Sequence, residues 1–305
     1  MLMTQTPFRI SFSGGSSDLQ DYLNSSHYGC VISASIDKYM YIALKNNFDE
    51  SYTLKYSITE QTNDIESIKH PLIRNALKRN YLSNLDFASF SDIPHGTGLG
   101  SSSAFTVGLL NALKTFRKDN FTQLSLAQEA QQIEIKDCNG NLGYQDQPGC
   151  AIGGCKFIEF INTESKVKTK VTPIKLDFKN YYLMLVYTGK QHSTNLQLSK
   201  KKDFKEIDDL VQLTLDLKNN KISLIDCIKE NWKIKSRTNN QFNDLYKHAI
   251  DNGAICGKLL GSGDGGFFLF LVEEPVGFVL DMNYDCFEIQ IDNRGTQCIL
   301  NTSVN

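Results

Sequence analysis

Three glycines at alternate positions, followed by three serines, constrain this chain more than any other feature. The run is Gly96-Thr97-Gly98-Leu99-Gly100-Ser101-Ser102-Ser103, and Pro94 stands two residues before it. Glycine–serine stretches are often linkers. Here, however, an apolar segment at 104–113 follows at once and is typical of a helix buried on most sides. Because a flexible linker would not lead directly into a buried helix, the pattern predicts a structured loop at a helix N-terminus.

A glycine loop that precedes a helix is suited to binding an anion. Free backbone N–H groups and the positive end of the helix dipole both favour phosphate, and glycine lets the backbone approach it closely. The serine hydroxyls add donors, or a ligand for a magnesium ion carried by the phosphates. The loop holds no lysine, which excludes the Walker pattern, and its third glycine falls at the wrong spacing for a Rossmann loop. We therefore expect a phosphate-binding loop of another kind.

Composition places the chain among globular proteins that act on small molecules. It has 305 residues, 41% hydrophobic and 22% charged, which allows two ordinary domains. The net charge of −2 gives no electrostatic case for binding nucleic acid or an anionic membrane surface. The eight cysteines are scattered without a Cys-x-x-Cys pair, and no targeting signal is visible, so we expect reduced thiols in a cytoplasmic protein. The longest wholly apolar run, 267–272, is far too short to span a bilayer.

Hydrophobic periodicity predicts a mixture of helices and strands. Phe8, Ile10 and Phe12 alternate with polar residues, which predicts a half-buried strand whose other face carries Arg9. The remaining elements are expected as strands at 39–44, 156–161, 181–187, 267–272 and 287–291, and as helices at 104–113, 124–136, 207–217 and 242–250. The polar, lysine-rich stretch 162–180 indicates a boundary. We expect an α+β protein of two domains, 1–172 and 173–305.

Two carboxylates are candidates for chemistry. Glu134 shares the apolar stripe of the predicted helix 124–136, where an ionised carboxylate costs several kcal/mol or so unless it is paired or binds a metal. The alternative is a glutamate at the edge of the stripe that reaches solvent. Asp146 lies in a turn-rich loop after that helix, where an aspartate is common in any case. It could also act as a general base.

A third carboxylate follows a pair of glycines near the N-terminus. Asp18 comes shortly after Gly14 and Gly15, and an aspartate at this place could cap a helix starting near 19.

Three segments of the chain resemble, in order, the signature motifs of the GHMP small-molecule kinases. Residues 7–19 are similar to the first motif, 94–104 to the second and 258–267 to the third, so the resemblance extends from residue 7 to about 272. This family includes galactokinase, homoserine kinase and mevalonate kinase. The Gly-Gly-x-x-Asp-Leu ending of the first motif is the form found in its heptose 7-phosphate kinase branch.

The resemblance implies a fold and a set of roles. The fold would be a two-domain GHMP kinase fold, with an N-terminal α/β domain carrying the phosphate loop and a ferredoxin-like C-terminal domain. ATP would bind the loop residues Pro94, Gly96, Thr97, Gly98, Leu99, Gly100, Ser101, Ser102 and Ser103. Ser102 and Glu134 would hold Mg²⁺, and Asp146 would be the catalytic base assisted by Arg9. The substrate would contact Gly14, Gly15, Ser17, Asp18, Lys190, His192, Gly261, Ser262, Gly263 and Gly265.

The third motif formally contains Gly-x-Gly-x-x-Gly. A strand rather than a helix is predicted after it, at 267–272, so a dinucleotide site is excluded. Two positions depart from the family pattern. Asp264 stands where relatives usually have glycine, and His192 stands where heptose 7-phosphate kinases often have arginine.

The expected reaction is transfer of phosphate from ATP to the C1 hydroxyl of D-glycero-D-manno-heptose 7-phosphate, giving the 1,7-bisphosphate. One alternative is a kinase for a free sugar such as fucose or galactose. Another is a catalytically silent sugar or ATP sensor, against which the presence of Asp146, Glu134 and Arg9 argues. The expected partners are a sugar phosphate and ATP, with no nucleic acid and no membrane. The kinase could also form a homodimer.

Overall fold

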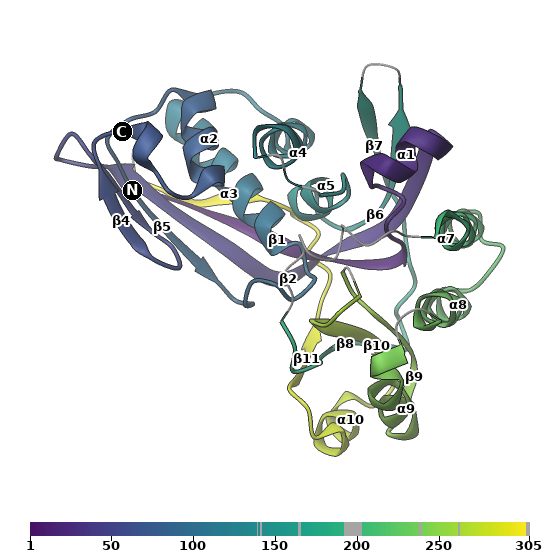
Figure 1. The fold of residues 1–305 in the computed structure, drawn as a ribbon. Coiled ribbons are helices and arrows are strands. Elements are labelled where there is room, and N and C mark those ends of the chain that lie inside the picture. Colours follow the sequence, from purple (N-terminus) through teal and green to yellow (C-terminus); the bar gives the residue numbers. More distant parts are fainter. Residues whose placement is uncertain are drawn as a thin grey trace.

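The computed structural model describes residues 1–138, 140, 142–163, 166–191, 203–237, 240–261 and 263–302. Its strands form two separate sheets (Figure 1). The larger sheet has eight strands in the order β12-β1-β2-β5-β3-β4, with β6 beside β2 and β7 beside β6. These strands are β1 (Leu2–Gly14), β2 (Tyr28–Asn46), β3 (Tyr52–Lys55), β4 (Thr59–Thr62), β5 (Leu85–Ser91), β6 (Cys155–Asn162), β7 (Val167–Pro173) and β12 (Gln297–Asn301). The β3–β5 pair is parallel and the other pairs are antiparallel.

Helices cover one face of the larger sheet. Figure 1 shows α2, α3, α4 and α5 above β1 and β2. The elements of this layer are α1 (Gln20–Ser26), the short 3₁₀ turn η1 (Ile65–Ser67), α2 (Pro71–Asn80), α3 (Ser101–Arg117), α4 (Gln123–Gln131), the π-helical turn η2 (Gln132–Asp137) and α5 (Asp146–Ala151). Residues 103–113 of α3 are all buried, which confirms the core helix predicted after the glycine loop.

The smaller sheet has the ferredoxin-like arrangement. Its strands are β8 (Tyr182–Tyr187), β9 (Ala254–Leu259), β10 (Phe267–Val272) and β11 (Cys286–Ile289). They lie in the order β11-β8-β10-β9, and all neighbours are antiparallel. Helices connect β8 to β9 and β10 to β11, so this part reads β-α-β-β-α-β. Those helices are α7 (Phe204–Lys218), α8 (Leu224–Ser236), the 3₁₀ turn η3 (Asn240–Phe242), α9 (Asn243–Asp251) and α10 (Pro275–Met282).

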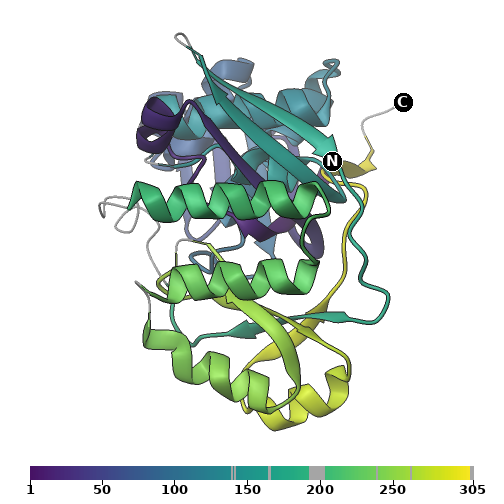
Figure 2. The same ribbon diagram turned by 90° about the vertical axis from the view of Figure 1, so that its right-hand side faces the viewer.

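Two helices and the last strand join the two sheets. Helix α7 packs on β1 and β2, whereas α8 packs on both β1 and β9 (Figure 2). Strand β12 returns to the larger sheet and pairs with β1, and the Met1 ammonium group donates to Thr302 Oγ1 at 2.7 Å. The predicted boundary at 172–173 falls at the end of β7. The lysine-rich stretch before it is not a linker but an edge strand, whose exposed position accounts for its polar composition.

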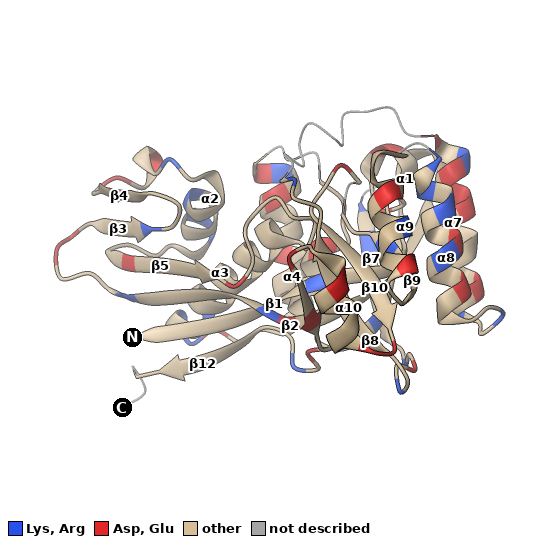
Figure 3. Ribbon diagram, turned by 90° about the horizontal axis from the view of Figure 1, so that it is seen from below, with Lys and Arg blue, Asp and Glu red and all other residues tan. Residues whose placement is uncertain are grey.

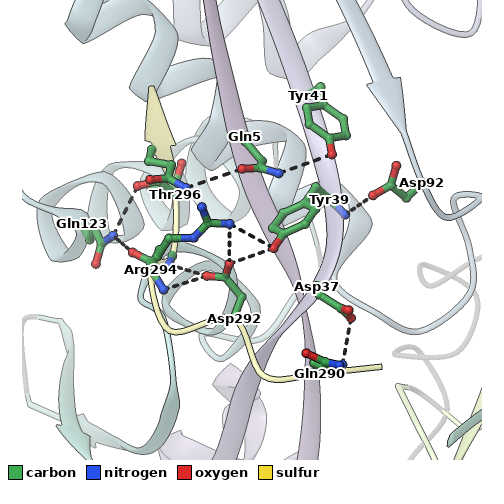
Figure 4. A network of polar contacts seen from close by, with 12 residues as sticks. Gln5, Asp37, Tyr39, Tyr41, Asp92, Gln123, Gln290, Asp292, Arg294 and Thr296 are labelled. Atoms are coloured by element: carbon green, nitrogen blue, oxygen red, sulfur yellow. Dashed lines mark hydrogen bonds and ion pairs between the residues drawn. The ribbon is translucent and has the colours of Figure 1, made fainter. Parts of the chain in front are cut away.

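A network of polar contacts fixes the connection between β11 and β12 against the first sheet (Figure 4). Tyr39 Oη donates to Asp292 Oδ2 at 2.9 Å, and the backbone N–H groups of Arg294 and Gly295 donate to Asp292 Oδ1. The same segment meets the end of α5, since Gly154 N donates to the carbonyl of Asp292 at 2.7 Å. The segment between β11 and β12 therefore holds the chain just after the short helix α5 in place.

The described part of the chain contains no helix long and apolar enough to cross a bilayer. All eight cysteines are free thiols.

A fully buried lysine closes the C-terminal end of α5. Lys156 Nζ donates to the carbonyl of Gly149 and to Ser35 Oγ, both at 2.8 Å, while Ser35 Oγ also donates to the carbonyls of Gly149 and Ile152. Burial lowers the pKa of Lys156 to about 7. The sequence offered no signal for this group, because an isolated lysine next to a strand reads as surface.

The depressed pKa of Lys156 predicts a pH-dependent stability. Between pH 7 and the ordinary lysine pKa near 10.4, the unfolded chain binds a proton here that the folded chain does not, so the free energy of unfolding rises with pH. We expect Lys156→Met to remove this rise, so that its stability relative to the wild type falls from pH 7 to about pH 10. Urea denaturation at several pH values measures the difference. Lys170→Met, at an exposed lysine on β7, is the matched control. A difference that stays constant with pH would contradict the prediction.

Candidate active site

The phosphate loop has the backbone that its three glycines predict. Gly96, Gly98 and Gly100 have φ values of +72°, +81° and +78°, a region that other residues seldom adopt. Gly100 is the N-cap of α3, and no described side chain caps the first turn of this helix. The first N–H groups of α3 therefore have no side-chain acceptor in the described chain, which is the arrangement that binds phosphate at a helix N-terminus.

The side chains of this loop divide into buried and exposed sets. Leu99, Thr97 and Ser103 are buried, and the Thr97 hydroxyl donates to the carbonyl of Pro94 at 2.9 Å. Pro94 and Ser102 are exposed, while Ser101 is half-buried. Leu99 thus anchors the loop in the core, and Ser101 and Ser102 are the hydroxyls open to a ligand.

The third motif packs directly on the phosphate loop. A Cβ on Gly261 would lie 2.6 Å from Gly98 Cα, and a Cβ on Gly266 would lie 2.2 Å from the carbonyl oxygen of Thr97. The two glycine loops therefore touch backbone to backbone. Gly265 lies similarly close to Lys190, and Gly266 N donates to the Lys190 carbonyl at 2.8 Å. Gly263 and Asp264 are half-buried in the same loop.

Two predicted substrate contacts, His192 and Ser262, lie outside the described residues. Lys190, the other predicted contact for the sugar phosphate, is described. Its Nζ lies 3.4 Å from Gln241 Oε1 and over the ring of Phe242.

Arg9 joins the Asp146 carboxylate to the glycine loop that precedes α3. Its Nε and Nη2 lie 2.8 Å and 2.7 Å from Asp146 Oδ1, and its Nη1 donates to the carbonyl of Gly98 at 2.6 Å. Burial lowers the pKa of Arg9, but the charge and hydrogen bond of Asp146, together with other acidic groups nearby, leave the pKa raised. The Arg9 side chain is only 6% exposed, whereas that of Asp146 is 29% exposed. Asp146, at the start of α5, therefore stays open to a reactant.

The end of the first motif contacts the residue just before Asp146. Asp18 is buried, and its carboxylate accepts hydrogen bonds from the backbone and side-chain N–H groups of Gln145, at 3.1 Å and 3.0 Å. Leu19, not Asp18, is the N-cap of α1, so the capping alternative is wrong. The Ser17 hydroxyl exchanges hydrogen bonds with the backbone of Cys30 on β2. This fully buried position favours a structural role for Ser17 over the predicted substrate contact.

Glu134 lies inside the protein, as its place on the apolar stripe predicts. It is 1% exposed, and its Oε2 accepts hydrogen bonds from Ser103 Oγ at 2.8 Å and from Gln147 Nε2 at 2.5 Å. The predicted single helix 124–136 is divided, because Glu134 belongs to the π-helical turn η2 and not to α4. Such turns shift the direction of side chains and occur often at functional sites.

The environment of Glu134 fits a bound cation. Among the described residues, Glu134 Oε1 and the neighbouring Gln147 Oε1 are buried acceptors without a hydrogen-bond donor. Burial raises the pKa of Glu134 to about 7, and the hydrogen bonds from its neighbours only partly oppose this. A divalent cation would supply the missing positive charge and hold the carboxylate ionised. Magnesium in kinase sites usually has one or two protein carboxylates and otherwise binds phosphates and water.

Ser103, not Ser102, contacts Glu134. Ser102 lies on the exposed side of the first turn of α3, where a metal ligand would face the phosphates. Its role as a ligand stays a prediction. Sequence reasoning missed Ser103 and Gln147 as partners of the glutamate. Gln147 could have been suspected, since it directly follows Asp146 in the motif.

The comparisons with known proteins agree with this geometry. Residues 68–154 match the family model "GHMP kinases N terminal domain". The chain is 28% identical over 312 residues to the D-glycero-alpha-D-manno-heptose 7-phosphate kinase of Campylobacter jejuni, with 89% of each chain covered. It is 21% identical to the galactokinase of Thermotoga maritima, covering 88% of this chain and 89% of that one. A crystal structure of a D-glycero-D-manno-heptose 1-phosphate kinase from Bacteroides thetaiotaomicron superposes with a TM-score of 0.81 at 20% identity, covering 99% and 100% of the two chains.

The chain has the GHMP kinase fold, and its residues 68–154 form a GHMP kinase N-terminal domain. The resemblance drawn from the three motifs is thereby confirmed. Among the relatives, the heptose 7-phosphate kinase and the galactokinases support a sugar kinase.

The raised pKa of Glu134 predicts that Glu134→Gln stabilises the protein when magnesium is absent. The folded chain holds a proton on Glu134 that the unfolded chain loses, so wild-type stability falls as pH rises from about 4.5 to 7. We expect the variant to have a higher Tm at pH 8, with no gain below pH 4.5. Mg-ATP should then raise the Tm of the wild type more than that of the variant. Scanning calorimetry with and without Mg-ATP measures both, and the exposed Glu230→Gln is the control. Equal Mg-ATP shifts in wild type and Glu134→Gln would exclude a metal at Glu134.

A second prediction tests whether Ser102 or Ser103 is the magnesium ligand. If Ser102 and Glu134 hold one ion, Ser102→Ala and Glu134→Gln should each raise the magnesium concentration that gives half-maximal nucleotide binding. The double variant should then show much less than the summed effect, because both groups serve one ligand. Ser103→Ala removes a partner of Glu134 and should have the smaller effect. A magnesium dependence that changes in Ser103→Ala and not in Ser102→Ala would assign the ligand to Ser103.

Proposed function

We propose that this protein is an ATP- and Mg²⁺-dependent kinase that phosphorylates the C1 hydroxyl of D-glycero-D-manno-heptose 7-phosphate, giving the 1,7-bisphosphate. The observation that carries the proposal is the double contact of Arg9, which bonds both the Asp146 carboxylate and the phosphate loop. A carboxylate held beside a glycine loop at a helix N-terminus supports phosphoryl transfer, which needs a hydroxyl acceptor close to the bound phosphates. The similarity to the heptose 7-phosphate kinase of Campylobacter jejuni supports the choice of sugar.

The roles of the residues follow from their contacts. The N–H groups at the start of α3 bind the phosphates of ATP. Asp18 is buried and accepts two hydrogen bonds from Gln145, so it positions the chain just before Asp146. Arg9 engages Asp146 Oδ1, so the other oxygen, Oδ2, faces the C1 hydroxyl and accepts its proton. The C1 oxygen then forms its bond to the γ-phosphorus as the bond to the β,γ-bridging oxygen breaks, and ADP leaves. Arg9 opposes the negative charge on the transferred group. Magnesium, held by Glu134 and Ser102, would neutralise phosphate charge when bound.

Two other functions remain as outcomes of the test. A kinase for a free sugar would use the same residues and reject the 7-phosphate. A sensor would bind nucleotide and sugar without turnover. The contact between Arg9 and Asp146 supports an enzyme over a sensor, because a binding protein has no need of an open carboxylate beside the phosphate loop.

The experiment is a kinase assay with Mg-ATP over a panel of free and phosphorylated hexoses and heptoses, with Asp146→Asn as the diagnostic variant. We expect the highest kcat/KM for the heptose 7-phosphate. Asp146→Asn should lower kcat by about 10²–10⁴-fold, with ATP affinity nearly unchanged. Asp49→Asn, at an exposed loop aspartate, is the control. An Asp146→Asn variant with more than about a tenth of the wild-type kcat would rule out the base, and a preference for a free sugar would rule out the heptose phosphate.

A further inference from the structure

Lys235, in the last turn of α8, approaches the glycine pair of the first motif. A Cβ on Gly15 would lie 3.4 Å from Lys235 Nζ, so the ammonium group lies against the backbone of this loop. The loop itself is fixed. Ser13 at the end of β1 is hydrogen-bonded to Thr214 of α7 at 2.8 Å, and a Cβ on Gly14 would overlap the carbonyl of Cys30. Lys235 is half-buried and therefore remains partly open to a ligand.

The same loop reaches the reacting centre at its other end. Asp18 is bonded to Gln145, the residue before Asp146. Residues 15–18 thus lead from the catalytic base to Lys235. A sugar whose C1 hydroxyl faces Asp146 and whose ring lies along residues 15–18 would direct its far end toward the Lys235 ammonium group.

Among the described residues, a second lysine and an unpaired amide are buried near Lys235. Lys258, at the end of β9, is fully buried, and its Nζ donates to the Ser11 carbonyl at 2.9 Å. Burial lowers the pKa of Lys258 well below its ordinary value, and the charges of Lys235 and Arg9 lower it further. Lys258 is therefore near both of those cations. One turn before Lys235, Asn231 is fully buried, and within the described chain neither amide atom has a hydrogen-bond partner.

This positive charge is local. Figure 3 shows acidic and basic residues interspersed along α7 and α8. At the loop, by contrast, the Lys235 ammonium group lies beside residues that would bind an uncharged sugar. Hydroxyl groups have no need of such charge, whereas a phosphate dianion does. Lys190, expected from the sequence to recognise the phosphate, contacts Gln241 and Phe242 instead.

We propose that Lys235, beside Gly15, forms a subsite for the distal phosphate of the sugar substrate. The proposal rests on the proposed function, because only a phosphorylated sugar has such a group. Lys235 would then be the specificity-determining residue that separates a sugar phosphate from the free sugar.

The test compares Lys235→Met with the wild type on the heptose 7-phosphate and on the same heptose without phosphate. We expect KM for the 7-phosphate to rise by about 10- to 100-fold, with kcat within a few-fold, because one charge-assisted hydrogen bond is lost. KM for the free heptose should not change. Lys235→Arg should restore most of the affinity, and Lys233→Met, on the exposed side of the same helix, should behave like the wild type. Circular dichroism and Tm establish that each variant is folded.

Three other results would contradict the subsite. If KM for the 7-phosphate stays within about twofold in Lys235→Met, the subsite is wrong although the proposed function stands. If KM rises equally for both sugars, or Lys235→Arg is as defective as Lys235→Met, the role of Lys235 is structural and the subsite is again wrong. If the wild type prefers the free heptose, the proposed function and the subsite fail together.

Discussion

The buried guanidinium group of Arg9 holds together the parts of this protein that must work together. It extends from a central strand of the larger sheet, bonds the carboxylate at the start of α5, and bonds a carbonyl of the phosphate loop. The Arg9 side chain is only 6% exposed, and burying its positive charge without partners would be costly. Here the charge has two partners, the Asp146 carboxylate and the carbonyl oxygen of Gly98. The backbone adds to the same junction, since Arg9 N donates to the Leu99 carbonyl at 3.1 Å. The position of the candidate base relative to the phosphate site therefore depends on one side chain.

Much of this arrangement could be predicted from local pattern. The glycine loop and its buried helix could be recognised, because positive φ and an apolar run leave a clear trace in sequence. The inward position of Glu134 followed from helical spacing alone. The pairing of Arg9 with Asp146 was expected only through the resemblance to the family. Strand alternation places Arg9 opposite the phenylalanine face but says nothing about what it meets there.

What could not be predicted depends on contacts between segments far apart in the chain. Ser102 and Ser103 are adjacent residues of the same type. Only the direction of the first turn of α3 decides which of them is hydrogen-bonded to Glu134. The π-helical turn that carries Glu134 has no distinct sequence signal. Lys156 and Lys258 read as ordinary surface lysines, because their buried acceptors, the carbonyls of Gly149 and Ser11, come from other elements. The polar stretch that indicated a domain boundary contains the edge strand β7, since an exposed strand and a polar connection have similar composition.

The return of β12 to the larger sheet has a consequence for the synthesis of this protein. Strand β1 carries Arg9, and its two neighbours are β2, which follows it closely in the chain, and β12, which consists of residues 297–301. During translation, β1 can pair with β2 early, but its other edge stays open until residues 297–301 have been made. An unpaired strand edge invites pairing with other chains. The strand that organises the candidate active site therefore has an open edge while most of the residues between β2 and β12 are being made.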